Sequence, residues 1–271
     1  AAEDFVSAES SESGGILYVF PAFRTARVGQ KIRRPAEDDL IRASLEYINV
    51  GETVDMGKLI VIEGLDGSGK GTQAELLAKN LEAQGKAVRK ISFPDYASDS
   101  SALVKMYLSG QFGSRPEDVN AYAASTFYAV DRFASFKRDW ENFYVDGGII
   151  VADRYTTSNA VHQCSKLPRE QWDAFLAWLF DFEYRLMGIP TPDLVVYLSV
   201  DPAVSQRLMT GRYHGDESKK DIHEGNLDYL RRSRQAAEYC SAHLGWKEVD
   251  CCRDGQMRSV DDIQAEILNL L

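Results

Sequence analysis

Short apolar runs alternate with longer segments of helical periodicity from residue 59 to the C-terminus. An apolar run of about four to eight residues bounded by turn residues is typical of a strand buried on both faces. Such runs predict strands over Leu59–Ile62, Val88–Phe93, Gly148–Ala152, Leu194–Val200 and Trp246–Val249. Helical patterns follow Gly69, Pro116, Pro168, Pro202 and Asp221. This alternation predicts an α/β fold in which helices cover both faces of a five-stranded parallel sheet.

The first 55 residues follow a different pattern. Residues 1–15 are acidic and rich in serine, and we expect them to be disordered because they cannot bury enough apolar surface. Ile16–Phe23 resembles a strand interrupted by Pro21, and Pro35–Glu52 carries apolar side chains on one helical face. Met56, the first methionine, directly precedes the first strand. We therefore expect an N-terminal extension of unknown role over 1–55, whose acidic residues disfavour a transit peptide, and a domain over 56–271.

Composition narrows the class of protein. The 271 residues are 44% hydrophobic, enough for a sizeable core, and carry a net charge of −10. Such a charge argues against a nucleic-acid-binding surface, so a phosphate ligand would need a local basic cluster. The cysteines lack paired C-x-x-C spacing, which favours a reducing, cytoplasmic setting. We also expect no membrane partner, because no apolar run approaches membrane-spanning length.

A glycine-rich loop follows the first strand. The segment IVIEGLDGSGKGTQ (Ile60–Gln73) nearly matches G-x-x-x-x-G-K-[ST], with the hydroxyl one position late at Thr72 because Gly71 intervenes. Small residues let backbone N–H groups converge on phosphate oxygens, and the following helix adds its positive dipole end. Lys70, interpreted as an exposed loop lysine, would reach the terminal phosphates. The alternative, a glycine-rich turn with an incidental lysine, is disfavoured by the flanking strand and helix.

Polar residues also follow the ends of the second and third predicted strands. FPDY (Phe93–Tyr96) follows the second strand, and DRYTTSNAVHQ (Asp153–Gln163) follows the third. Ligands of parallel α/β sheets bind at the carboxyl ends of the strands. There Asp153 could hold Mg²⁺ and Arg154 could clamp a transferring phosphoryl group. The alternative is an ordinary Asp–Arg surface pair.

From Met56 to the C-terminus the chain resembles thymidylate kinase of the bacterial type. The resemblance rests on the order and spacing of EGLDGSGKGTQ, FPDY, FYAVDRF, DRYTTSNAVHQ, PDLVVYLSVDP and GRYHGDESKKDIHE. It implies a P-loop nucleoside monophosphate kinase fold and ATP-dependent phosphorylation of dTMP to dTDP, for dTTP biosynthesis. It also implies Mg²⁺ as cofactor, ATP as co-substrate and assembly as a homodimer.

The same resemblance implies a role for each matching residue. Catalytic roles fall to Asp66, Lys70, Arg154 and Arg212. ATP contacts fall to Gly64, Asp66, Gly67, Ser68, Gly69, Lys70, Gly71, Thr72, Lys219 and Lys220. The acceptor site comprises Phe93, Tyr96, Tyr128, Arg132, Asp153, Arg154, Ser158, Asn159, His162 and Gln163. The metal candidates are Asp66, Asp153, Asp221 and Glu224.

The resemblance also implies a base pocket, and the helical spacing of its residues is compatible with it. Tyr128 takes the stacking position under the thymine ring, and Arg132, four residues later on the same helix face, reaches the base carbonyl. The Asn159 amide suits both a donor and an acceptor on the pyrimidine edge. Without the motif context, an aromatic residue and an arginine at this spacing are more often ordinary packing.

A lid is implied over about 211–224. Some thymidylate kinases carry a catalytic arginine in the phosphate loop, but positions 65–68 here contain no basic residue, so the charge must come from elsewhere. Arg212, Lys219 and Lys220 lie in a segment rich in glycine and charged residues that is suited to closing over ATP. Asp221 and Glu224 match a D-x-x-E spacing near the metal. The alternatives are a solvated charged loop and favourable N-terminal helix charges.

Two positions depart from the family pattern. Gly71 replaces the hydroxyl residue that usually binds Mg²⁺, and Thr72 would instead contact the α-phosphate, as in the similar adenylate kinases. His162 stands near the sugar at a position that is commonly aromatic, so discrimination against a 2′-hydroxyl would be weaker or arranged differently.

Two rival functions remain open at this point. Another nucleotide or deoxynucleoside kinase would share the phosphate loop and differ in its acceptor. A non-catalytic phosphate-loop module would bind ATP to switch a partner. The acceptor-site residues between Tyr128 and Gln163 count against the second, because a switch needs no second nucleotide pocket.

Overall fold

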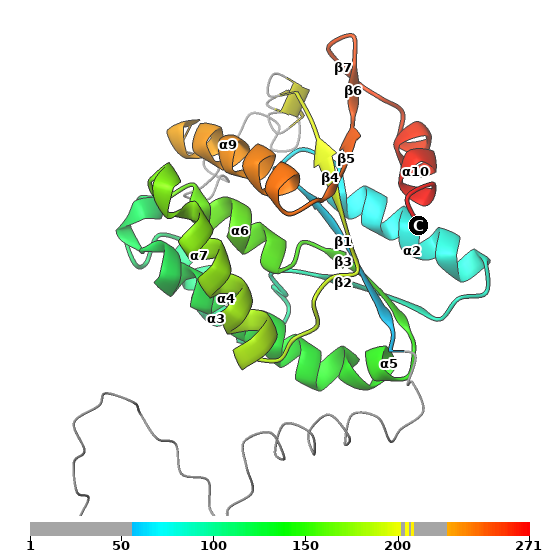
Figure 1. The fold of residues 1–271 in the computed structure, drawn as a ribbon, viewed down its shortest axis with the longest axis horizontal. Coiled ribbons are helices and arrows are strands. Elements are labelled where there is room, and N and C mark those ends of the chain that lie inside the picture. The colour runs from blue at the N-terminus through cyan, green and yellow to red at the C-terminus, as the bar shows by residue number, and fades with distance from the viewer. Residues whose placement is uncertain (1–55, 202–203, 206, 209–226) are drawn as a thin grey trace, which may run out of the picture. The chain divides into compact units, whose positions relative to one another are not determined.

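Five parallel strands form the centre of the structure, a computed structural model that describes residues 56–201, 204–205, 207–208 and 227–271 (Figure 1). The strands are β1 (Lys58–Gly64), β2 (Val88–Ser92), β3 (Ile149–Asp153), β4 (Leu194–Ser199) and β5 (Lys247–Asp250). They lie in the order β2-β3-β1-β4-β5, so the central strand β1 pairs with both β3 and β4. All five carboxyl ends therefore meet at one edge of the sheet, where α/β proteins bind their ligands.

Helices connect the strands across the sheet. The α-helices are α2 (Lys70–Ala83), α3 (Ala102–Leu108), α4 (Ala121–Ser135), α5 (Glu141–Val145), α6 (Thr156–Cys164), α7 (Trp172–Phe180), α9 (Leu227–His243) and α10 (Val260–Leu268). Short 3₁₀ turns are η1 (Asp99–Ser101), η2 (Pro116–Asp118) and η4 (Arg169–Gln171), and π-type turns are η3 (Phe136–Trp140) and η5 (Asp181–Leu186). A two-stranded hairpin, β6 (Cys252–Arg253) and β7 (Gln256–Met257), follows β5.

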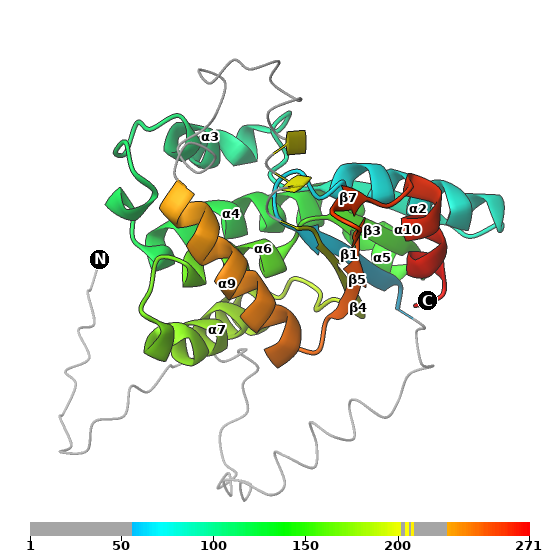
Figure 2. The same ribbon diagram turned by 90° about the horizontal axis from the view of Figure 1, so that it is seen from above.

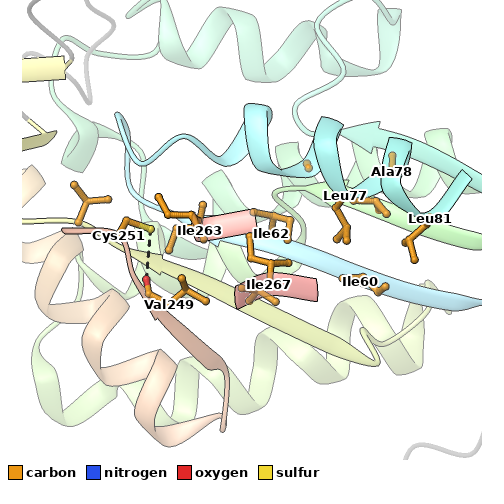
Figure 3. Packing of buried hydrophobic residues seen from close by; sticks show 14 of the residues in the cluster. Ile60, Ile62, Leu77, Ala78, Leu81, Val249, Cys251, Ile263 and Ile267 are labelled. Carbon is orange, nitrogen blue, oxygen red and sulfur yellow. Dashed lines mark hydrogen bonds between the residues drawn. The ribbon is translucent and has the colours of Figure 1, made fainter. Parts of the chain in front are cut away.

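One face of the sheet packs against α2 and α10. Ile60 and Ile62 of β1 point to this face and contact Leu77 of α2 and Ile263 and Ile267 of α10 in one buried cluster (Figure 3). Because successive strand residues alternate between faces, Leu59 and Val61 point to the other side. The apolar run of β1 thus serves two cores, as a fully buried strand requires.

The opposite face is covered mainly by α5, α6, α7 and α9 (Figures 1 and 2), whereas α3 packs on α4. Near β1 and β3, Trp140 and Tyr144 belong to the cluster that contains Leu59 and Val61. Near β4, Tyr197 joins a cluster supplied by α6, α7 and α9, which includes Trp172. None of the helices that the structure describes is long and apolar enough to cross a membrane.

The predicted strands are confirmed to within one or two residues at each end. The helix predicted after Pro116 is confirmed as α4: a 3₁₀ turn comes first, and α4 starts at Ala121, where the Asn120 side chain caps it by accepting from the Ala123 N–H. The patterns did not predict α3, α5, α6 or α10 as helices. The extension over 1–55 and the lid over 211–224 lie outside the described residues.

Candidate active site

The glycine-rich loop joins β1 to α2 at the ligand-binding edge of the sheet. A Cβ on Gly64 would lie 2.6 Å from Ser68 Oγ and 3.0 Å from the Leu198 carbonyl oxygen. Only glycine therefore fits at the start of this loop. Gly69 has φ 84°, in the left-handed region that glycine adopts most readily. The first turn of α2 has neither a side-chain cap nor an acidic residue. Its free N–H groups and positive dipole end suit a phosphate.

Lys70 is buried, not exposed as the sequence pattern suggested. Its side chain folds back into the loop, where Nζ donates to the Leu65 carbonyl oxygen at 2.9 Å and lies 3.9 Å from Asp66 Oδ1. Burial, reinforced by the nearby Arg154 charge, lowers the pKa of Lys70 to about 8. A bound polyphosphate would restore the missing counter-charge and favour the ammonium form.

Arg154 links the end of β3 to the loop. Its backbone takes φ 67°, a conformation uncommon for residues with a side chain and frequent at functional sites. The guanidinium donates to Asp66 Oδ1 and, through Nη1, to Ser158 Oγ at 3.3 Å. Burial opposes its charge, but the carboxylates of Asp66 and Glu63 overcome this and raise the pKa of Arg154. Asp66 therefore forms ion pairs with two cations, Lys70 and Arg154.

Glu63 is a site residue that the sequence analysis missed. It lies in β1 with only 1% of its surface exposed. Its Oε2 accepts from Thr157 Oγ1 at 2.7 Å and from Ser158 Oγ at 2.8 Å, while Oε1 lies 3.8 Å from Arg154 Nη1. A buried carboxylate needs several donors, and here they fix the first turn of α6 against β1.

The predicted base pocket is assembled from α4, α6 and β2. Tyr128 and Arg132 lie on α4 as the spacing predicted, and the ring of Tyr128 stands at 90° to that of Tyr107 with centroids 6.5 Å apart. Phe93 is buried, whereas Tyr96 is 55% exposed at the rim. Arg132 is 2% exposed and forms a two-point ion pair with a second unpredicted carboxylate, Glu183.

The structure changes the chemistry available from Asn159. Its Nδ2 donates to the Ser125 carbonyl oxygen at 3.2 Å and to Glu183 Oε1 at 3.1 Å. Both amide hydrogens are therefore committed, and the side chain offers a ligand only its acceptor oxygen, not the donor and acceptor that the sequence suggested.

Gln163 differs from Asn159 in that its side-chain amide is unpaired. It is fully buried, yet neither its amide nitrogen nor its amide oxygen has a hydrogen-bond partner within the described residues. An unpaired buried amide costs free energy, and because Gln163 lines the cavity, a ligand that pairs with it would recover this cost.

His162 is held between two partners. Its Nε2 lies 3.3 Å from Arg154 Nη1, and its Nδ1 lies 3.3 Å from the Tyr229 hydroxyl. Because arginine can only donate, Nε2 accepts and Nδ1 carries the proton. Burial, together with Arg154, lowers the pKa of His162 to about 3, so the ring is neutral at physiological pH.

The metal candidates fit Mg²⁺ in part. Asp153 Oδ1 is buried without a hydrogen-bond partner in the described part of the chain, and a Cβ on Gly71 would lie 3.1 Å from Asp153 Oδ2. A side chain at position 71 would therefore press on the Asp153 carboxylate, which glycine avoids. Among the described residues there is no group of three or more metal-ligating side chains. Mg²⁺ commonly takes only one or two carboxylates beside phosphates and water.

These residues share one cavity of about 770 Å³, a size suited to small ligands. The predicted residues in its lining are Asp66, Gly67, Gly69, Lys70, Gly71, Thr72, Phe93, Tyr96, Tyr128, Arg132, Asp153, Arg154, Ser158, Asn159, His162 and Gln163. Lining residues that were not predicted are Ser92, Pro94, Leu108, Tyr155, Leu208 and Met257. The structure does not bring the predicted Gly64 and Ser68 to the wall. Arg212, Lys219, Lys220, Asp221 and Glu224 lie outside the described residues.

Comparison with known proteins agrees with this site. The family model for thymidylate kinase matches residues 62–254. The chain is 30% identical to the thymidylate kinase of Mycobacterium tuberculosis over 191 residues, which cover 69% of this chain and 87% of that protein. It is 31% identical to a probable thymidylate kinase of Thermococcus gammatolerans over 221 residues, covering 80% and 96% of the two chains.

A solved structure shows the same fold. The thymidylate kinase of Candida albicans superimposes with a TM-score of 0.58 at 21% identity, covering 79% of this chain and 91% of that one. The predicted P-loop nucleoside monophosphate kinase fold is thereby confirmed. The matching family model spans most of the chain, including the phosphate loop, the Asp153–Arg154 corner and the base-pocket helix, and the chain belongs to the thymidylate kinase family.

Proposed function

We propose that this chain transfers the γ-phosphoryl group of ATP to dTMP, giving dTDP and ADP. One observation carries the proposal: the phosphate loop and the base-pocket residues line the same cavity. A donor triphosphate on Lys70 and an acceptor base beside Tyr128 would therefore face each other across a shared space. Membership of the thymidylate kinase family supports the same reaction.

The protein's contribution is alignment and positive charge. The N-terminus of α2 and the loop amides bind the donor phosphates, and Lys70 lies where its charge can reach them. Arg154, anchored by Asp66 and Ser158, supplies positive charge between the two nucleotides. In-line transfer between nucleotides held in this way needs no covalent intermediate.

Mg²⁺ belongs to the proposal as a cofactor. Asp153 Oδ1, which has no hydrogen-bond partner among the described residues, and Asp66, which lines the same cavity, would hold the ion. When bound, Mg²⁺ neutralises charge on the transferring phosphoryl group. We further propose that the segment over about 211–224 is a lid that adds Arg212, Lys219 and Lys220 on the ATP side and Asp221 and Glu224 near the metal.

Two finer proposals concern the setting of the enzyme. The first is assembly as a homodimer, as the family resemblance implies, with the exposed apolar side chains Leu103 of α3 and Val130 and Phe133 of the adjacent α4 as candidates for the interface. Sedimentation equilibrium of the purified chain would test that state.

The second proposal is a cytoplasmic location. The four cysteines, all within the described residues, form no disulfide, which is consistent with it.

A panel of acceptors tests the activity. With saturating ATP, we expect the order of kcat/KM to be dTMP, then dUMP, then dCMP. Loss of the 5-methyl group costs apolar contact worth roughly 1 to 3 kcal/mol, so dUMP should be about ten- to two-hundredfold worse. ADP release is measured by a coupled assay, with UMP and AMP as further acceptors. Equal kcat/KM for dTMP and dCMP would leave a broader nucleotide kinase instead.

A further inference from the structure

Glu183 lies outside the cavity wall but contacts two residues within it. The side chain is fully buried on the π-type turn η5, and its carboxylate accepts four hydrogen bonds. Two come from Arg132, through Nε at 2.7 Å and Nη2 at 2.6 Å. The others come from Thr156 Oγ1 at 2.8 Å and Asn159 Nδ2 at 3.1 Å. Arg132 and Asn159 line the cavity, whereas Glu183 and Thr156 do not.

The ion pair fixes which part of Arg132 is left for a ligand. Glu183 occupies the edge of the guanidinium formed by Nε and Nη2. The remaining Nη1 lies 3.5 Å from the Tyr155 carbonyl oxygen, at the long limit of a hydrogen bond, and carries a second hydrogen. Arg132 therefore presents a donor at Nη1.

The same carboxylate fixes the orientation of the Asn159 amide. A carboxylate only accepts, so the group facing Glu183 must be the amide nitrogen. The second amide hydrogen goes to the Ser125 carbonyl oxygen. Asn159 therefore presents an acceptor, Oδ1, and it could not present a donor without losing both bonds.

We propose that Glu183 is a positioning residue that sets the hydrogen-bond polarity of the base pocket and so selects an imide base. The acceptor of Asn159 matches a ring N3–H, and the donor of Arg132 matches a 4-carbonyl, as in thymine and uracil. Cytosine reverses both groups, because its N3 accepts and its 4-amino group donates. This proposal rests on the proposed function, since it assumes that the cavity receives a nucleotide base.

The local backbone supports a dedicated role for this carboxylate. In η5 the Met187 N–H donates to the Phe182 carbonyl oxygen at 2.9 Å, which is the wide i to i+5 spacing of a π-turn. Such turns occur frequently at functional sites. A buried ion pair is also rarely the most stabilising choice, because apolar residues of similar volume often serve stability as well or better. Retaining Arg132 and Glu183 in the core therefore favours a role in recognition.

The first test is Glu183→Asp, which keeps the charge opposite Arg132 but withdraws it by one methylene. The longest of the four bonds, to Asn159, should be lost first and release the amide. We expect the dTMP-over-dCMP ratio of kcat/KM to fall by about tenfold or more, with KM for ATP unchanged. The matched control is Thr156→Val, which removes another donor to the same carboxylate; its ratio should stay within about twofold of the unmutated enzyme.

A rescue pair separates polarity from packing. Glu183→Gln should also lower the dTMP-over-dCMP ratio, because its amide can donate to Asn159 and reverse that side chain. Adding Asn159→Asp to Glu183→Gln restores an acceptor toward the base and returns the negative charge, so the preference should recover. Equal losses for dTMP and dCMP in Glu183→Asp, or a folded double variant without recovered preference, would overturn the proposal. If instead the unmutated enzyme fails to prefer dTMP, the proposed function itself is wrong.

Discussion

Lys70, the first residue of α2, is buried beside the cavity, and burial lowers its pKa to about 8 from an ordinary value of 10.5. In the free enzyme the ammonium loses its proton as pH rises through about 8. We expect kcat/KM for ATP to fall above that pH, approaching about tenfold per pH unit, because kcat/KM reports the free enzyme. A pH profile checks this, with Lys70→Arg as the control whose residual activity should stay flat. A flat profile in the unmutated enzyme to pH 9.5 would contradict the assignment.

The same shift affects stability with a defined sign. Between about pH 8 and 10.5 the unfolded chain binds more protons at Lys70 than the folded chain. The contribution of Lys70 to the free energy of unfolding therefore rises with pH across this window. Activity with ATP and stability without ligand should move in opposite directions there.

Gln163 provides a second prediction at the scale of one side chain. Gln163→Leu removes a buried amide that has no partner within the described residues, so the ligand-free protein should gain about 1 kcal/mol or more in its free energy of unfolding. KM for dTMP should rise, because the ligand loses that amide as a partner. Urea unfolding and steady-state kinetics test the two effects. A rise in stability with unchanged KM would show that the amide does not bind the acceptor.

The two buried glutamates mark what sequence could and could not predict about the site. Glu63 interrupts the apolar run of β1, and a charge inside a buried strand is a readable signal of a polar network. Glu183 gives a weaker signal, because it lies in a helical segment that also carries exposed charges. Its neighbour Asp181, two positions earlier, forms an exposed pair with Arg185. Glu183 instead follows the buried Leu179 by four residues and so continues the buried face of α7, but the spacing alone does not reveal its partner Arg132.

At the scale of elements, α4 carries Tyr128 and Arg132 and begins at a defined cap. Asn120 Oδ1 accepts from the Ala123 N–H at 2.9 Å. Asn120→Ala should lower the free energy of unfolding by about 0.5 to 2 kcal/mol, since one N–H of the first turn loses its acceptor. Asn142→Ala, at an exposed side chain of α5 without a described hydrogen bond, is the matched control and should change stability by less than about 0.5 kcal/mol. Equal losses of stability for the two variants in urea titrations would show that the Asn120 cap does not stabilise α4.

The central strands β1, β3 and β4 were predictable because the core faces them from both sides. Leu59–Ile62 of β1 is buried throughout, so this run is apolar at every position. The helix α6 was not predicted as an element. Its buried positions include Thr157, Asn159 and Gln163, so polar groups that serve the site occupy the face that would otherwise show apolar periodicity. Where a helix wall is also a binding wall, hydrophobic pattern is a poor guide.

At the scale of the whole molecule, the domain boundary near Met56 remains a prediction. The sheet begins at Lys58, and the Gly57 N–H donates to the Tyr144 carbonyl oxygen at 2.7 Å. All predicted site residues come later in the chain. A chain starting at Met56 should therefore fold and phosphorylate dTMP with kcat/KM within about threefold of the full chain. An insoluble or inactive truncation, beside an active full chain, would show that residues 1–55 complete the domain.

The placement of the aromatic core has a spectroscopic consequence. All four tryptophans lie within the described residues: Trp140 and Trp172 in the packed clusters, Trp178 and Trp246 beside them, and none in the cavity wall. Intrinsic tryptophan emission should therefore follow the loss of packing between helices and sheet while remaining nearly insensitive to nucleotide occupancy. Emission could then monitor unfolding in the presence of saturating nucleotide without a separate correction for quenching, and a tryptophan introduced at Tyr128 would supply the missing optical signal for the acceptor.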